Sequence, residues 1–220
     1  MFDVGIATKQ AIYNLKSGTQ PNLAGGIYEE DNGNGSLMRI LPLLLYIKDK
    51  PVDERYELTK LVSSMTLGHI RSVISCFYYL KFAKLLTEQK DLFEAYKTLQ
   101  TIIPAYLNSK SINPKEVALF YHLLVGDISK LKEEKIFSTG YVLHTLETSI
   151  WCLLTTQNYA DAVLKAVNLG SDTDTTGAVT GGLAGILYGA DSIRLSWVNQ
   201  LARVDDIKDL ASRLHSEFSV

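Results

Sequence analysis

The sequence has little cysteine, no long apolar run and no excess of either charge, and each shortage excludes a class of protein. Only two cysteines occur in the 220 residues, Cys76 and Cys152, and each is isolated in an apolar stretch. Buried free thiols in a reducing cytoplasm therefore fit them better than a disulfide framework or a zinc site. The net charge of −2 provides no bulk attraction for phosphates, so we expect no general nucleic-acid binding.

The apolar tracts are too short for a membrane protein. Glycine or polar residues interrupt each tract before it reaches the ~20 residues that a transmembrane helix needs. The opening stretch FDVGIATKQAI places acidic and basic side chains where a signal peptide has its apolar core. We therefore expect a cytoplasmic chain without a membrane partner.

The spacing of apolar residues predicts helices almost throughout. The predicted helices cover residues 2–16, 54–65, 70–86, 91–107, 114–124, 141–155, 194–201 and 205–218. No strand-like alternation runs longer than about four residues. Since 46% of the residues are hydrophobic, the chain can bury one sizeable core. The fold class expected is a single all-α domain over residues 1–220.

A glycine-rich segment near the C-terminus predicts one further helix, which we expect to be the central one. Glycine recurs every fourth residue at Gly177, Gly181, Gly185 and Gly189, which places these residues on one face of a helix. Glycine costs about 1 kcal/mol against alanine inside a helix. A stripe of glycines therefore predicts that a neighbouring backbone approaches closely. We expect most of the other helices to pack around this one.

A polar cluster directly precedes the glycine stripe. Asp172, Asp174 and Thr175 supply two carboxylates and a hydroxyl. This all-oxygen set suits Mg²⁺, Ca²⁺ or Mn²⁺ better than zinc. The alternative is structural: Ser171 or Asp172 caps the helix and Asp174 complements its dipole. Spacing alone favours capping over a metal site.

A second candidate site lies in the Gly- and Asn-rich stretch of residues 17–35, which predicts a loop or a set of turns. At its end, Asn34, Gly35 and Ser36 precede an apolar run. Glycines there let the backbone approach a ligand, and the amides of the following helix start could face a phosphate. The alternative is an ordinary Asn-Gly turn with Ser36 as a helix cap.

Two further pairs of polar residues lie on predicted helices. His144 and Glu147 share one face of an apolar helix, a spacing that could serve acid–base chemistry. More often such a pair is a satisfied couple beside a core. His69 and Arg71 fall where two predicted helices meet, and we expect them to make polar contacts at a helix start.

Three stretches together resemble the ADP-ribosylglycohydrolase family, of the dinitrogenase-reductase-activating type. They are AVNLGSDTDTTGAVTGGLAGILYG, NGNGSLMRILPL and GYVLHTLETSIWCLLTTQNYADAVLKAV. They occur in the family's order, and the resemblance covers essentially the whole chain. It implies a hydrolase with a single orthogonal helical domain. Such a hydrolase binds ADP-ribose or an ADP-ribosylated substrate and usually holds two Mg²⁺ ions beside the scissile glycosidic bond.

Carried over by position, the resemblance implies roles for seven residues. The implied metal ligands are Asp172, Asp174 and Thr175. The implied substrate-binding residues are Asn34, Gly35, Ser36 and His144. Arg39, behind the loop, fits a structural ion pair better than a phosphate contact. No catalytic residue is assigned, because the general base would lie outside the matched motifs.

The chain also departs from the family pattern. The family's GDALG-like helix and Thr-Asp-Asp metal motif have no counterpart here. Residues 1–220 therefore correspond to the C-terminal two-thirds to three-quarters of the family domain, with the N-terminal helices missing. In place of the family's usual Thr-His pair this sequence has Thr66-Leu67, and the histidine nearest in sequence is His69.

Two functional hypotheses follow from the resemblance. The first is an Mg²⁺-dependent hydrolase that cleaves the glycosidic bond of ADP-ribosylated substrates. The second is a catalytically impaired, truncated homologue that acts as a binding or oligomerising module, since Mg²⁺ needs about six oxygen ligands. A missing helical layer would leave apolar surface uncovered, which favours a homodimer or a separately encoded N-terminal chain as partner.

Overall fold

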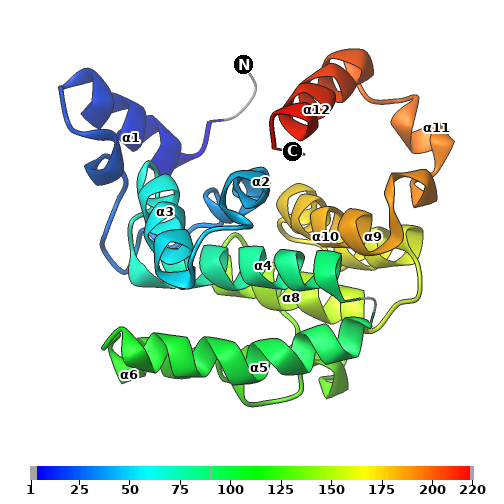
Figure 1. The fold of residues 1–220 in the computed structure, drawn as a ribbon, viewed down its shortest axis with the longest axis horizontal. Helices are drawn as coiled ribbons and strands as arrows, with labels where there is room; N and C mark the ends of the chain where they lie inside the picture. The colour runs from blue at the N-terminus through cyan, green and yellow to red at the C-terminus, as the bar shows by residue number, and fades with distance from the viewer. Residues whose placement is uncertain (1–3, 90, 219–220) are drawn as a thin grey trace.

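The computed structural model describes residues 4–89 and 91–218, and it confirms the all-α fold class (Figure 1). The α-helices are α1 (Ile6–Lys16), α2 (Leu43–Ile47), α3 (Val52–Ser64), α4 (Ile70–Glu88), α5 (Leu92–Ser109), α6 (Pro114–Ala118), α7 (Tyr121–Leu124), α8 (Val142–Leu154), α9 (Tyr159–Asn168), α10 (Thr173–Tyr188), α11 (Leu195–Val198) and α12 (Val204–Phe218). The 3₁₀ helices are η1 (Pro21–Leu23), η2 (Leu37–Arg39), η3 (Ile128–Lys130), η4 (Glu133–Lys135) and η5 (Ala190–Ser192). Isolated β-bridges join Gly26 to Leu67 and Gly33 to Tyr141.

The core lies where α4, α8 and α10 meet. Helix α10 makes its main contacts with α9, α8 and α4, so the expectation that most helices pack around it is wrong. The more central helix is α4, which has main contacts with five other α-helices, α2 and α3 among them. Helix α4 buries residues around most of its circumference, because it contacts α3, α5, α8 and α10 on different sides. Figure 1 shows α4 and α8 across the middle of the molecule, with α5 on one side and α9 and α10 on the other.

The glycine stripe on α10 faces side chains, so the expected contact between two backbones is wrong. A Cβ atom on Gly177 would lie 3.1 Å from Val167 Cγ2, and one on Gly181 would lie 3.2 Å from Tyr159 Oη. These side chains of α9 fill the space that the missing Cβ atoms leave. Gly189 does not belong to the packed stripe, because it ends the helix with a φ of 83°.

Two predicted helical runs are divided. The apolar run after Ser36 forms η2 and then α2, with Pro42 at the α2 N-cap, and proline has no N–H to continue the hydrogen bonds of a preceding helix. Ser36 makes no side-chain capping bond, so its expected role as a helix cap is wrong. The run at 114–124 splits into α6 and α7 at Phe120, whose side chain is fully buried.

Both cysteines are free and buried, as expected from their apolar surroundings. Burial raises the pKa of the Cys76 thiol to about 11. Burial likewise raises the pKa of Cys152 to about 12. Both thiols are therefore protonated at neutral pH and poor nucleophiles.

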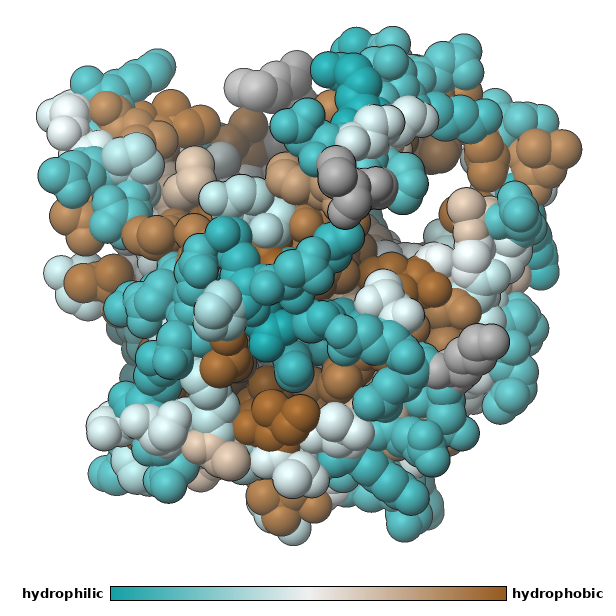
Figure 2. All heavy atoms as spheres, viewed as in Figure 1, coloured by the Kyte–Doolittle hydropathy of each residue, from teal (hydrophilic) through white to brown (hydrophobic). Residues whose placement is uncertain are grey.

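Apolar surface is exposed on α1 and α12, which both lie along the upper edge of the view in Figure 1, α1 at the left and α12 to the right of centre. Helix α1 buries only Ala11, whereas Ile6 and Tyr13 are exposed. In α12, Ile207 and Leu210 are exposed as well. Figure 2 shows hydrophobic residues at the surface above α1. Over the described residues, no helix combines the length and the apolar character needed to cross a membrane.

Candidate functional site

The loop before η2 and the start of α10 meet at one hydrogen bond. Asn34 Nδ2 donates to Asp172 Oδ2 at 2.6 Å, across 138 residues of sequence. The same amide donates to Thr145 Oγ1 of α8 at 2.8 Å. Asn34 is buried, with 8% of its surface exposed, so these contacts fix its side chain. The two motifs that the sequence singled out therefore lie side by side.

Backbone pairing holds the Asn34 loop against the start of α8. The Asn34 N–H donates to the Gly140 carbonyl at 3.0 Å, and the Val142 N–H donates to the Asn32 carbonyl at 2.9 Å. Gly140 also leaves room beside the carboxylate, since a Cβ atom there would lie 3.5 Å from Asp172 Oδ2. The loop, the start of α8 and the start of α10 thus form one unit.

Asp172 occupies the N-cap position of α10, but its side chain makes no capping bond. Its N–H donates to the Ser138 carbonyl at 3.0 Å, and its carboxylate accepts a bond from Asn34 instead of from a backbone N–H of its own helix. Gly170 and Ser171, with φ of 78° and 57°, redirect the chain just before this residue. The alternative that Asp172 or Ser171 caps the helix through its side chain is therefore wrong.

Asp174 lies in the first turn of α10, next to Asp172. Hydrogen bonding with the Asp172 carboxyl, followed by the backbone N–H groups of Thr175 and of Asp174 itself, holds the pKa of Asp174 below its ordinary value. The position also complements the helix dipole. Two carboxyls in contact repel each other when both are charged, unless a proton or a cation lies between them.

Asp172, Asp174 and Thr175 fit a hard cation in the kind of donor that they offer. All three side chains present oxygen, which Mg²⁺ prefers. Within residues 4–89 and 91–218, however, no group of three or more His, Cys, Asp or Glu side chains could hold a metal. A bound Mg²⁺ would therefore need further oxygen ligands, such as water, besides the two carboxylates and the hydroxyl of this cluster.

The other predicted site residues lie around this unit in different ways. Gly35 is half-buried in the loop, whereas Ser36 is fully buried, with its hydroxyl accepting a bond from Cys76 Sγ at 3.5 Å. His144 Nδ1 pairs with Thr139 Oγ1 at 2.8 Å, directly before Gly140. Burial lowers the pKa of His144, which favours a neutral imidazole at pH 7. Ser36 thus supports the loop from behind, and His144 lies at the edge of the unit.

Among the described residues Arg39 pairs with neutral acceptors and with no carboxylate, contrary to the sequence-based expectation. Its Nη2 donates to the Val62 carbonyl at 3.0 Å and to Thr66 Oγ1 at 2.8 Å. The side chain therefore joins η2 to the end of α3 through neutral acceptors. Thr66 itself lies next to the 17–35 loop, because residues 64–68 pair with Gly25 and Gly26 of that loop.

Glu147 pairs with His122 of α7, and not with His144 as its spacing predicted. The distance from Glu147 Oε1 to His122 Nδ1 is 3.1 Å, and only 13% of the Glu147 side chain is exposed. Burial, the largest cause, raises the pKa of Glu147, and His122 partly opposes this shift. Folding therefore makes the protonated form of this acid more favourable than it is in the unfolded chain.

We expect the Glu147→Gln variant to be more stable than the parent at pH 7 and equally stable near pH 4. An acid with a raised pKa stabilises the fold fully below its unfolded value, and this contribution is lost as the pH rises through the folded value. Glutamine keeps the shape and cannot ionise. Thermal denaturation at a series of pH values should show a rise of about 2–4 °C for each kcal/mol regained.

Exposed Glu134 provides the control, because its replacement by glutamine removes the same charge from the surface. If the two variants show the same pH dependence, burial does not set the protonation of Glu147.

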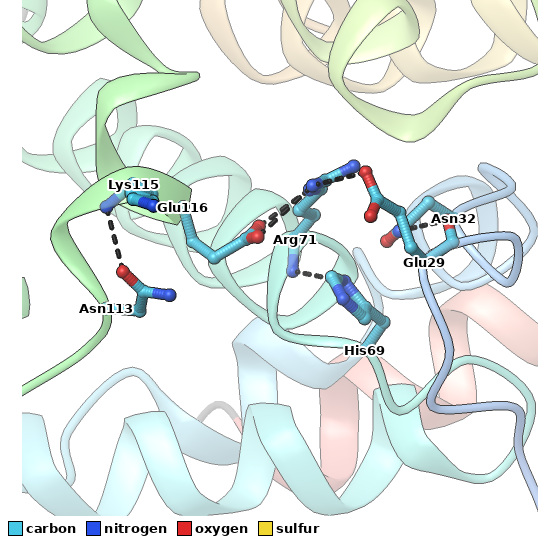
Figure 3. Close-up of polar contacts among 7 residues, drawn as sticks. All are labelled: Glu29, Asn32, His69, Arg71, Asn113, Lys115 and Glu116. Atoms are coloured by element: carbon cyan, nitrogen blue, oxygen red, sulfur yellow. Dashed lines mark hydrogen bonds and ion pairs between the residues drawn. The ribbon is translucent and has the colours of Figure 1, made fainter.

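Arg71 joins three segments near the loop, a cluster that sequence reasoning missed in part (Figure 3). The expected contact at the helix start is confirmed, because the Arg71 N–H donates to His69 Nδ1 at 3.3 Å. The guanidinium also pairs with Glu116 of α6 at 2.6 Å and with Glu29 of the loop at 2.9 Å. These partners lie 45 and 42 residues away, and nothing in their local sequence indicates the pairing.

A family model described as ADP-ribosylglycohydrolase matches residues 1–220. The chain therefore belongs to the ADP-ribosylglycohydrolase family. ADP-ribosylarginine hydrolase Tri1 of Serratia proteamaculans (strain 568) is 30% identical over 217 residues, which cover 97% of this chain and 54% of that protein. ADP-ribosylhydrolase ARH3 of Danio rerio is 28% identical over 238 residues, which cover 96% of this chain and 64% of that protein.

A solved structure, from an ADP-ribosylglycohydrolase-related protein complex, has the same fold. It superimposes with a TM-score of 0.78 at 25% identity, covering 96% of this chain and 69% of that one. The chain thus spans about half the length of the Tri1 proteins that it matches and about two-thirds of the solved relative.

Proposed function

We propose that this chain forms the ADP-ribose-binding part of a glycohydrolase that releases ADP-ribose from modified substrates, with Mg²⁺ bound at Asp172, Asp174 and Thr175. The observation that carries the proposal is the 2.6 Å bond from Asn34 Nδ2 to Asp172 Oδ2, which joins the loop and the acidic cluster in one unit. The relatives support the substrate class, because Tri1 is named as a hydrolase of ADP-ribosylarginine.

The residues of this chain would bind and orient the substrate. Bound Mg²⁺ would supply positive charge that orients ribose hydroxyls and lowers the pKa of a coordinated water. Asn34 fixes the direction of the Asp172 carboxylate, and the lowered pKa keeps Asp174 charged. Gly35 lets the loop backbone approach a ligand, and Gly140 leaves room beside Asp172 Oδ2.

A second candidate function is binding without turnover. The acidic cluster offers three oxygen donors from one short segment, and Mg²⁺ takes about six. No third carboxylate joins the cluster in the described part of the chain. By this reading the chain alone binds ADP-ribose weakly, acting as a binding or oligomerising module, and hydrolyses conjugates very slowly.

Calorimetry with ADP-ribose, with and without millimolar Mg²⁺, tests the proposed site. We expect binding that depends on Mg²⁺ and that the Asp172→Ala, Asp174→Ala double variant loses. Release of ADP-ribose from an arginine-linked conjugate then separates the two candidate functions. Turnover on the order of 1 s⁻¹ identifies an enzyme complete in this chain, and binding alone identifies the module. Binding that the double variant retains would contradict the site.

A further inference from the structure

We propose that Arg71 is a positioning residue: through Glu29 it holds the loop so that the Asn34 amide reaches Asp172. The inference rests on the proposed function, since it concerns the geometry of the same site. It gives Arg71 a role at the site, beyond the helix-start contact that the sequence predicted and beyond anything that the names of the relatives state. Figure 3 shows the guanidinium of Arg71 between Glu116 on one side and Glu29 on the other.

The end of this network at Glu116 is rigidly built. Arg71 Nε and Nη2 donate to the two carboxylate oxygens of Glu116 at 2.6 and 3.1 Å. The exposed fractions of the two side chains are 12% and 19%. Paired N–H donors on one carboxylate fix direction as well as distance. Arg71 also holds the pKa of Glu116 below its ordinary value, so the pair stays charged at neutral pH.

The other end of the network is the loop itself. Arg71 Nη2 donates to Glu29 Oε1 at 2.9 Å. The backbone carbonyl of Glu29 accepts a bond from Asn32 Nδ2 at 2.7 Å, and the carbonyl of Asn32 accepts one from the Val142 N–H at 2.9 Å. A continuous series of hydrogen bonds therefore runs from Arg71 through Glu29 and Asn32 to the start of α8.

Asn34 lies two residues beyond Asn32 in this series. Its bond to Asp172 is 2.6 Å long, and a hydrogen bond weakens steeply once donor and acceptor separate beyond about 3.2 Å or lose alignment. A shift of the loop by less than 1 Å would therefore change the Asp172 contact. Backbone pairing with residues 140–142 holds one side of the loop. On the other side, the Arg71–Glu29 pair adds a side-chain contact to the backbone bonds that join Gly25 and Gly26 to residues 64 and 68.

Because Glu29 is exposed, a variant at this position can distinguish a role in positioning Asn34 from a role in stabilising the fold. Its side chain is 71% exposed, and an exposed ion pair contributes only about 0–1 kcal/mol to stability. Loss of the Glu29 carboxylate should therefore leave the unfolding temperature nearly unchanged while moving the Asn34 amide. A residue with only a structural role would lower the unfolding temperature or do nothing at the site.

The test uses the full chain and the variants Glu29→Gln and Arg71→Lys. Lysine keeps the charge of Arg71 but cannot fork to Glu116 and Glu29 together. The matched control is Glu88→Gln, which breaks the exposed ion pair with Lys84 on the same helix. The first readout is the ¹H–¹⁵N signal of the Asn34 side-chain amide, which is assigned by its disappearance in Asn34→Asp. The second readout is the affinity for ADP-ribose with Mg²⁺ present.

We expect both variants to shift the Asn34 signal. Glu29→Gln should weaken ADP-ribose binding by up to about fivefold, which is the limit for a contact that contributes at most about 1 kcal/mol, and Arg71→Lys should weaken it at least as much. The control should change neither readout. A Glu29→Gln protein whose Asn34 signal and affinity match those of the control overturns the proposal, whether or not Arg71→Lys folds. If the parent chain binds no ADP-ribose, the proposed function fails, and the amide signal alone still decides whether Arg71 positions Asn34.

Discussion

Replacing Asn34 by aspartate should destabilise the chain at neutral pH by about 1.5–3 kcal/mol, the contribution of a hydrogen bond to a charged group. In the parent, the amide of Asn34 donates to Asp172 from a buried position. Aspartate has nearly the same shape but presents only acceptors. Two carboxylates would then face each other at hydrogen-bonding distance, and like charges disfavour ionisation of both.

The pH and metal dependence of this variant follow from the same contact. Repulsion raises one pKa of the carboxylate pair, so the variant should recover stability as the pH falls and a proton enters the pair. Millimolar Mg²⁺ should also raise its unfolding temperature more than that of the parent, because a cation relieves the repulsion. Thermal denaturation at pH 5 and pH 7, with and without Mg²⁺, measures both effects.

Asn158→Asp is the matched control, because the Asn158 amide also donates to an aspartate, Asp161, at 2.8 Å. That pair is exposed at the N-cap of α9, where aspartate caps as well as asparagine does. The control should therefore change the unfolding temperature by little. An Asn34→Asp protein that melts with the parent at pH 7 without divalent cations would contradict the buried contact.

The sequence predicted those features that depend on short spacings. Helical periodicity placed the long helices α4, α5 and α8 within a few residues of their observed bounds. The glycine spacing indicated the helix α10, but α4 and not α10 is the helix around which most others pack. The family resemblance assigned the Asn34 loop to the substrate and Asp172 to a metal ion beside the scissile bond, which implies that the two motifs lie close together. Their direct contact is consistent with that expectation, whereas their roles toward ligand and metal stay predictions.

Features that depend on distant partners could not be predicted in the same way. Glu147 has a histidine three residues away on its own helix, yet its partner is His122 of α7, because packing of α7 against the core brings that ring closer. Arg71 likewise pairs with residues more than 40 positions away. The local sequence favours Asp172 as a side-chain helix cap. In the structure its carboxylate makes no capping bond and accepts a hydrogen bond from the buried Asn34 amide.

The close packing at Gly182 could not be predicted from the four-residue glycine spacing, because Gly182 lies outside that stripe. A Cβ atom on Gly182 would lie 2.5 Å from Tyr79 Oη and 2.7 Å from Leu41 Cδ2, far closer than normal contact. Leu41 can rotate away, but Tyr79 is buried and its hydroxyl donates to the Val179 carbonyl at 3.0 Å. The tyrosine therefore cannot withdraw without losing this bond.

We therefore expect Gly182→Ala to destabilise the chain by about 1–3 kcal/mol, which is typical of overpacking, and Gly182→Leu to prevent folding. Gly185→Ala is the matched control on the same helix, because its Cβ would meet nothing closer than 3.9 Å. There, removal of a helical glycine should stabilise the chain by up to about 1 kcal/mol. Opposite signs in urea denaturation would show that the packing of α10 against Tyr79 of α4 requires glycine at position 182. Two stabilising substitutions would mean that this contact relaxes freely and that Gly182 is not required for the packing.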